Sequence, residues 1–180
     1  MRTQSRGFSI IELVVTLTVG AILLGIAVPS FTEIIRQNRI ANQTNEFMVT
    51  LAMARSEAVK RGGRVSVCSS NAQQTACAPG ATNWANGWLL FSDVVAPAGE
   101  VNIDGAPPDD AIIQAWPAPS EEAMEVTSGR TYLSYDSDGR ADANTVFTVR
   151  PHVCGSGAQN VRTITVNPSG RVGKAATACP

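Results

Sequence analysis

The sequence predicts an α+β protein, with one long N-terminal α-helix packed against an antiparallel β-sheet head. Two observations predict this class: the first third of the chain reads as a helix that ends at two glycines, and short β-rich runs bounded by turn residues follow. The 180 residues are 44% hydrophobic and 16% charged, with a formal net charge of -1. This composition argues against a disordered polyelectrolyte and against binding of nucleic acid through overall charge.

The first element is an apolar segment, expected over residues 8–32, that is long enough to cross a membrane. Leu13 to Thr32 contains no charged residue, and about twenty helical residues span roughly 30 Å, the thickness of a bilayer's hydrocarbon core. Arg2 and Arg6 precede it, which favours a cytoplasmic N-terminus. A cleavable secretory signal is the alternative, but the apolar run is longer than the apolar region of a typical signal peptide. The presence of Glu12 near the start of this segment also needs an explanation, because a carboxylate at mid-membrane depth costs about 2.5–3.5 kcal/mol.

The residues around Glu12 resemble a known processing signal. Residues 7–13, GFSIIEL, are similar to the G-F-x-x-x-E signature of type IV pilins and type II secretion pseudopilins. The resemblance implies that residues 1–7 are a leader, that prepilin peptidase cleaves between Gly7 and Phe8, and that Phe8 is then N-methylated. Without the leader, 12 basic residues face 15 acidic ones, a net charge of -3.

The same resemblance gives Glu12 a role in assembly. It implies a salt bridge between Glu12 and the new amino group of Phe8 on a neighbouring subunit, since a buried carboxylate is tolerable when it is paired. The alternative is that Glu12 lies at the membrane interface and reaches the headgroups. Pro29 predicts a helix kink, because proline removes a backbone donor and clashes with the preceding turn. Pilins that this sequence resembles carry a proline at the matching place.

From residue 33 to 61 the helical pattern becomes amphipathic, and Arg61-Gly62-Gly63 supplies a stop. One face is spaced alternately by four and three residues: Ile40, Thr44, Phe47, Leu51, Ala54 and Ala58. The opposite side carries Asn38, Arg39, Gln43, Asn45 and Arg55. A coiled coil is the alternative for such a face, but the strand-rich region that follows favours packing on a sheet.

The head is expected over residues 64–180, with half-buried antiparallel strands. The candidate strands are Arg64–Cys68, Gly87–Ser92, Ala111–Trp116, Thr131–Tyr135, Thr145–Arg150 and Val161–Val166. The alternation is clearest at Val65, Val67, Val146, Thr148, Ile164 and Val166. Asp138-Gly139 and residues 167–170 read as turns, and residues 96–119 read as long irregular connections.

Several runs at the end of the helix and in the head resemble the GspH/FimT family of pilin-like proteins. They are residues 54–59, 64–68, 87–93, 138–140 and 167–171. The resemblance implies a minor pilin at or near a filament tip that helps to initiate assembly; the alternatives are a minor pseudopilin of type II secretion and a DNA-binding pilin. The implied partners are prepilin peptidase, the major pilin and other minor pilins, or pseudopilins. The implied location is the inner membrane with a periplasmic head, and afterwards a pilus tip or a periplasmic pseudopilus.

The four cysteines lie in the part expected outside the cytoplasm, where disulfides persist. They allow three pairings, and the loops between them favour the local pairs Cys68–Cys77 and Cys154–Cys179. A metal site using Cys154 and His152 lacks ligand spacing. We expect no metal, no cofactor and no catalysis, because no serine or cysteine has an evident histidine partner.

Two charged clusters remain. Arg162, Arg171 and Lys174 are candidates for contact with DNA phosphates, but solvated charges on a hairpin fit the acidic net charge better. Residues 136–142 are rich in carboxylates but lack the glycine position and the final glutamate of a calcium loop, so a hairpin turn is the better interpretation.

Overall fold

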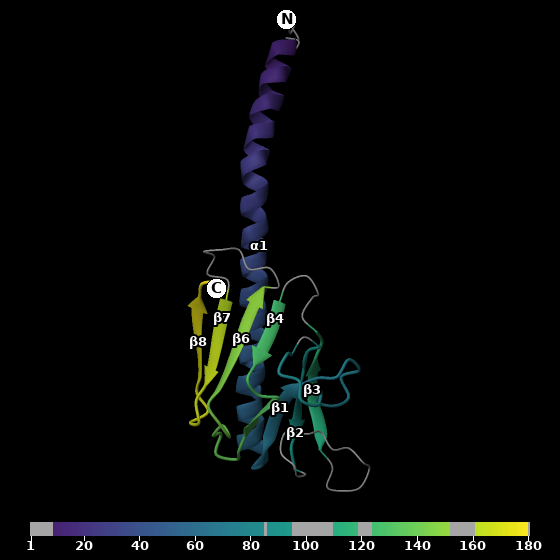
Figure 1. Ribbon diagram of the computed structural model, residues 1–180, viewed down its shortest axis with the longest axis vertical. Helices are drawn as coiled ribbons and strands as arrows, with labels where there is room; N and C mark the ends of the chain where they lie inside the picture. The colour runs from purple at the N-terminus through teal and green to yellow at the C-terminus, as the bar shows by residue number, and fades with distance from the viewer. Residues whose placement is uncertain (1–8, 85, 95–109, 119–123, 152–160, 180) are drawn as a thin grey trace, which may run out of the picture. The chain divides into compact units, whose positions relative to one another are not determined.

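The computed structural model describes residues 9–84, 86–94, 110–118, 124–151 and 161–179, leaving aside the side chains of residues 28–30, 33, 124 and 125. These residues form one helix, α1 (Ile10–Arg61), and eight strands, β1 to β8 (Figure 1). The chain divides into two compact parts, Met1–Gln37 and Asn38–Pro180. Because α1 contributes to both parts, each part is described separately, and the second part is called the head.

The helix ends where the two glycines predict. Gly62 has a φ of 64°, in the left-handed region that glycine adopts without steric cost. Its N–H donates to Val59 O (3.3 Å), and the N–H of Gly63 donates to Ala58 O (3.2 Å). These two bonds are the Schellman pattern, which satisfies carbonyls that the helix end would otherwise leave without donors.

The buried face of α1 in the head is the one that the spacing predicts, and it is wider than predicted. Its six residues are at most 1% exposed: Ile40, Thr44, Phe47, Leu51, Ala54 and Ala58. Thr50 is also fully buried, and Gln43, which the pattern placed on the outer side, is 8% exposed. The Thr44 hydroxyl donates to Ile40 O (2.7 Å), so burial leaves it with a partner.

The head contains two four-stranded antiparallel sheets where the sequence predicted one. The first has the order β3-β2-β1-β5 and consists of β1 (Val65–Ser69), β2 (Trp88–Ser92), β3 (Ala111–Trp116) and β5 (Tyr132–Tyr135). The second has the order β4-β6-β7-β8 and consists of β4 (Met124–Ser128), β6 (Thr145–Pro151), β7 (Val161–Val166) and β8 (Val172–Thr177).

The division into two sheets has a local cause at β5. The N–H of Asp142 donates to Ser134 O (2.9 Å), and the Asp142 carboxylate accepts from the N–H of Ser134 (3.2 Å). Ala141 forms an isolated bridge with Tyr135. These residues occupy the outer edge of β5, so β6 cannot pair there and instead pairs with β4 and β7.

The sequence missed two strands, β4 and β8, and misjudged the burial of others. β8 is poor in β-branched and aromatic residues, which are the usual strand formers, whereas β4 has as many of them as β1. Every residue of β1 is buried, although its alternation predicted one exposed face, because apolar residues also cover its second face. In β6 the buried residues are Thr145, Phe147, Val149 and Pro151, while Val146 is 44% exposed.

An aromatic cluster joins α1 to both sheets. The ring of Phe47 on α1 lies 4.9 Å from Trp88 of β2 and 4.7 Å from Phe147 of β6, centroid to centroid. Trp84 lies 5.5 Å from Phe47 and 5.1 Å from Phe147. The arrangements are edge-to-face, the favoured geometry for aromatic pairs. Trp88 also donates its indole N–H to the buried hydroxyl of Thr50 (3.0 Å).

Two predicted turns pack against each other and against α1. In one turn, Gly139 has a φ of 72°, and in the other Gly170 has a φ of 76°. The N–H of Ala141 donates to Pro168 O (3.1 Å), which connects the turns. Arg55 of α1 donates to Ser169 O (3.3 Å), so the end of the helix and both hairpins form one unit.

Candidate functional site

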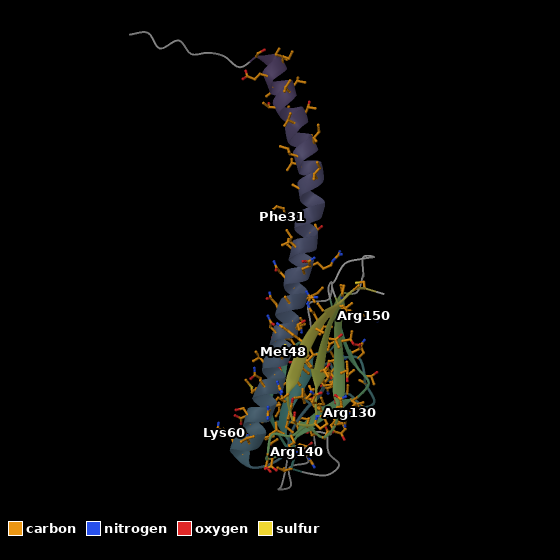
Figure 2. All side chains as sticks on the ribbon, turned by 90° about the vertical axis from the view of Figure 1, so that its left-hand side faces the viewer. Phe31, Met48, Lys60, Arg130, Arg140 and Arg150 are labelled. Carbon is orange, nitrogen blue, oxygen red and sulfur yellow. A yellow bond between two sulfur atoms is a disulfide. The ribbon has the colours of Figure 1, made fainter. Side chains whose placement is uncertain are left out.

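The N-terminal half of α1 is apolar and exposed along its length. Ile10–Ala27 is an 18-residue stretch with a mean hydropathy of 2.4, long enough by length and composition to cross a membrane. None of its residues is buried (Figure 2 shows side chains on all sides of it). The hydroxyls of Thr16 and Thr18 donate to Leu13 O (2.9 Å) and Val14 O (2.7 Å). The helix therefore satisfies these polar groups internally, as a bilayer requires.

Glu12 is the acidic residue in the first turn of α1, and it is exposed. A carboxylate in this turn lies near the positive end of the helix dipole. The proposed partner, the amino group of Phe8 on another subunit, and the predicted cleavage site between Gly7 and Phe8 lie outside the described residues. Pro29 lies within α1, which continues through it; the kink stays a prediction.

The cysteines stiffen the head. Cys68 at β1 and Cys77 are joined by a disulfide, with a Cα–Cα distance of 5.7 Å. Cys68 is fully buried beside Leu89 and Phe91, so the bond links the polar loop after β1 to a second apolar cluster. Cys179 is also disulfide-bonded. Its predicted partner, Cys154, and His152 lie outside the described residues.

A buried polar network holds β1, β2 and β5 together. Asp93 is 1% exposed and accepts a hydrogen bond from Arg64 (2.7 Å). Ser66 donates to the second oxygen of Asp93 and lies 2.6 Å from the hydroxyl of Ser134. The hydrogen bond to Asp93 raises the pKa of the Arg64 guanidinium, and partial burial opposes this. The network therefore joins residues 64–68 to residues 87–93, two of the runs on which the family resemblance rests.

Two of the three candidate DNA-contacting residues lie together, and the third is not part of the same groove. Arg162 of β7 and Lys174 of β8 line the same groove. Arg171 lies in the turn between those strands, three residues from Lys174, or about 10 Å along an extended chain.

The groove lies between α1 and β8 and has a volume of about 270 Å³. Ala41, Thr44 and Asn45 line its helix side, and Lys174 donates to Asn45 Oδ1 across it (3.4 Å). Sequence reasoning missed these helix residues. The predicted turn at 167–170 offered a signal, because a hairpin closed there sets Lys174 opposite Ile164, close to Arg162.

The carboxylate-rich loop is a turn, as expected. Asp136 accepts hydrogen bonds from the N–H groups of Asp138 (3.0 Å) and Arg140 (2.8 Å). In the part of the chain that the structure describes, no group of three or more histidine, cysteine, aspartate or glutamate residues could hold a metal ion.

Comparison with known proteins defines first the class and then the family. The model of the prokaryotic N-terminal methylation motif matches residues 2–28, which places the chain among proteins with a prepilin-type N-terminus. The model of the type II transport protein GspH matches residues 43–170, from within α1 through strands β1 to β7. The chain belongs to this family, the GspH/FimT-like type IV pilins and pseudopilins.

Two solved structures are similar to this chain, both of the type IV minor pilin FimU of Pseudomonas aeruginosa strain PAO1 in different crystal forms. The first is 18% identical, covers 83% of this chain and 92% of its own, and has a TM-score of 0.49. The second is 17% identical, covers 73% of this chain and 88% of its own, and has a TM-score of 0.48. A comparison with curated protein sequences finds no match.

Proposed function

We propose that this protein is a minor, tip-associated type IV pilin that helps to initiate pilus assembly through contacts with other pilins. Its apolar helix anchors it in the inner membrane before assembly and becomes part of the filament core afterwards. The head then supplies the surface that other subunits contact. Prepilin peptidase is the processing partner, and the chain carries out no catalysis of its own.

The observation that carries this proposal is Glu12 in the first turn of an exposed, apolar helix that matches the N-terminal methylation motif. A carboxylate within apolar surroundings is costly unless another group compensates its charge. An N-terminal amine of a neighbouring subunit supplies that charge only when subunits associate. The pair would therefore favour assembly over the isolated membrane protein.

Substitution of Glu12 tests the assembly role. We expect Glu12→Gln to leave processing intact and to lower the amount of this protein in sheared filaments by about a hundredfold or more, since loss of a buried pair costs about 3–5 kcal/mol. Mass spectrometry of the mature N-terminus measures processing, and quantitative immunoblotting measures incorporation. A variant that begins at N-methylated Phe8 and enters filaments normally would exclude the role of Glu12.

A minor pseudopilin of a type II secretion system is the second candidate function. The matching family model, described as a type II transport protein, favours it. Deletion of the gene separates the two functions: loss of surface pili with normal secretion supports the pilin, and the reverse supports the pseudopilin.

DNA binding is a third possibility, and the acidic net charge of the chain argues against it. A gel-shift titration of the full chain in detergent, at several salt concentrations, tests it. We expect no shift at low salt. A shift that weakens with salt and is lost in the Arg171→Gln, Lys174→Gln variant would establish phosphate contact.

A further inference from the structure

β8 forms one outer edge of the second sheet, and this edge is open. Its residues from Gly173 to Thr177 are exposed. Among the residues that the structure describes, those of β8 pair only with β7. An unpaired strand edge presents a row of backbone donors and acceptors to any extended chain that approaches it.

Two of the other three outer strands, β4 and β5, are covered by the chain itself. At β4, the N–H of Trp84 donates to Val126 O (2.8 Å) from the outer side. At β5, the N–H of Asp142 donates to Ser134 O (2.9 Å) in the same way. The fold thus blocks pairing at these two edges and leaves it possible at β8, which is what a site for strand addition requires.

The hairpin geometry identifies the backbone groups that face outward. The N–H of Asn167 donates to Arg171 O (3.0 Å), so these residues form a hydrogen-bonded pair. Hydrogen-bonded and non-bonded pairs alternate in an antiparallel ladder. Gly173 and Ala175 therefore bond to β7, opposite Thr165 and Thr163. The alternate residues, Val172, Lys174 and Ala176, direct their N–H and C=O groups away from β7.

The groove beside this edge favours a negatively charged group, because two basic residues line it. Lys174 is paired with buried Ile164, so its side chain lies on the face of the sheet turned toward α1, where it reaches Asn45. Arg162 lines the same groove. In the described part of the chain, no carboxylate lies within 4 Å of the Lys174 ammonium group. A carboxylate on an added strand would supply this missing counter-charge.

We propose that β8 accepts an extended strand from a different subunit of the same assembly, with an acidic side chain directed into the groove toward Lys174. Small or apolar side chains at the neighbouring inward positions would lie against Ala41. The strand needs about six residues, or roughly 20 Å, to match β8. Main-chain hydrogen bonds provide affinity in this mode, and alternate side chains provide specificity. The proposal rests on the proposed function and names its contact surface.

Photo-crosslinking in cells that express the whole assembly tests the proposal. Benzoylphenylalanine replaces Asn45, which lines the groove, or Val146, which is exposed on β6, as the control. We expect a crosslinked product only from position 45, with the attached peptide mapped by mass spectrometry to an acidic, extended segment of another subunit. Equal yields at both positions, or attachment to DNA or to a second copy of this chain, would overturn the proposal.

Two pairs of variants separate the backbone and charge contributions. Ala176→Pro removes an outward-facing N–H without touching a bond to β7, whereas Ala176→Ser keeps that donor. Lys174→Glu reverses the charge, and Lys174→Arg retains it. We expect the proline and glutamate variants to lower crosslinking at position 45 by about fivefold or more, while serine and arginine preserve it. Unchanged crosslinking in both disruptive variants contradicts strand addition.

Failure of strand addition at β8 can be distinguished from failure of the proposed function. Presence of the protein in sheared filaments, with a processed N-terminus, is measured on the same cells. Absence of the crosslink in protein that enters filaments refutes strand addition at β8 and leaves the minor-pilin function intact. Absence of the protein from both filaments and pseudopili refutes the function itself.

Discussion

Gly170→Ala provides a sharp test of the packing between the two turns. An added Cβ at Gly170 would lie 2.0 Å from the carbonyl oxygen of Gly139 and 3.0 Å from Arg55 Nε. The first contact is with backbone, so the turns must separate, and the bond from Ala141 N to Pro168 O would be lost with them.

The expected loss of stability has two parts. A left-handed backbone conformation costs about 1–2 kcal/mol for a residue with a Cβ. Loss of the Ala141–Pro168 bond and of the Arg55–Ser169 bond adds about 1–3 kcal/mol. We therefore expect a decrease of about 2–5 kcal/mol in the free energy of unfolding. Urea denaturation of the full chain in detergent, followed by the fluorescence of the buried tryptophans, measures it.

Gly80→Ala is the matched control. Gly80 also has a positive φ, 67°, but a Cβ there would meet nothing within 4 Å. It should lose only the backbone contribution of about 1–2 kcal/mol. If Gly170→Ala is no more destabilising than Gly80→Ala, the stacked turns do not contribute to stability as we reason.

Two further substitutions, at Tyr135 and at the Cys68–Cys77 disulfide, have predictable effects on stability. Burial raises the pKa of the Tyr135 hydroxyl well above its ordinary value of about 10, and this hydroxyl has no hydrogen-bond partner among the described residues. The unfolded chain therefore loses this proton first as the pH rises through 10, and the folded state is destabilised by up to about 1.4 kcal/mol per pH unit above that value. Tyr135→Phe should remove this loss of stability above pH 10 and leave stability at pH 7 nearly unchanged. Urea titrations at pH 7 and above pH 10 would show this. If the loss above pH 10 persists in the variant, another group is responsible for it. The double variant Cys68→Ala, Cys77→Ala should lower stability by about 2–4 kcal/mol, and an unaltered urea midpoint would exclude a stabilising role.

The helix and its buried face could be predicted because their signals are local. A spacing of three and four residues from Ile40 to Ala58 defines a face, and Gly62 defines an end, without reference to the rest of the chain. Burial of β1 on both faces could not be predicted in this way. The alternation of Val65 and Val67 indicates one buried face, whereas the second is covered by residues distant in sequence.

The groove depends on non-local pairing, and so it was predicted only in part. Lys174 and Arg162 were selected for their charge, but their proximity follows from the register of β7 with β8. β8 itself, with the sequence VGKAAT, has little strand propensity and exists because the turn at 167–170 directs it back along β7. Propensity alone therefore misses an edge strand that the hairpin specifies.

Through the contacts of Phe47 with both sheets, the last part of α1 forms one side of the hydrophobic core of the head. None of the described side chains upstream of Ile40 is buried, whereas from Ile40 onward one face is enclosed. Proteolysis ahead of residue 38 would consequently release a head with its interior closed. A cut beyond Ile40 would open that interior to water, so only the first kind of cleavage can yield a freely diffusing, folded fragment.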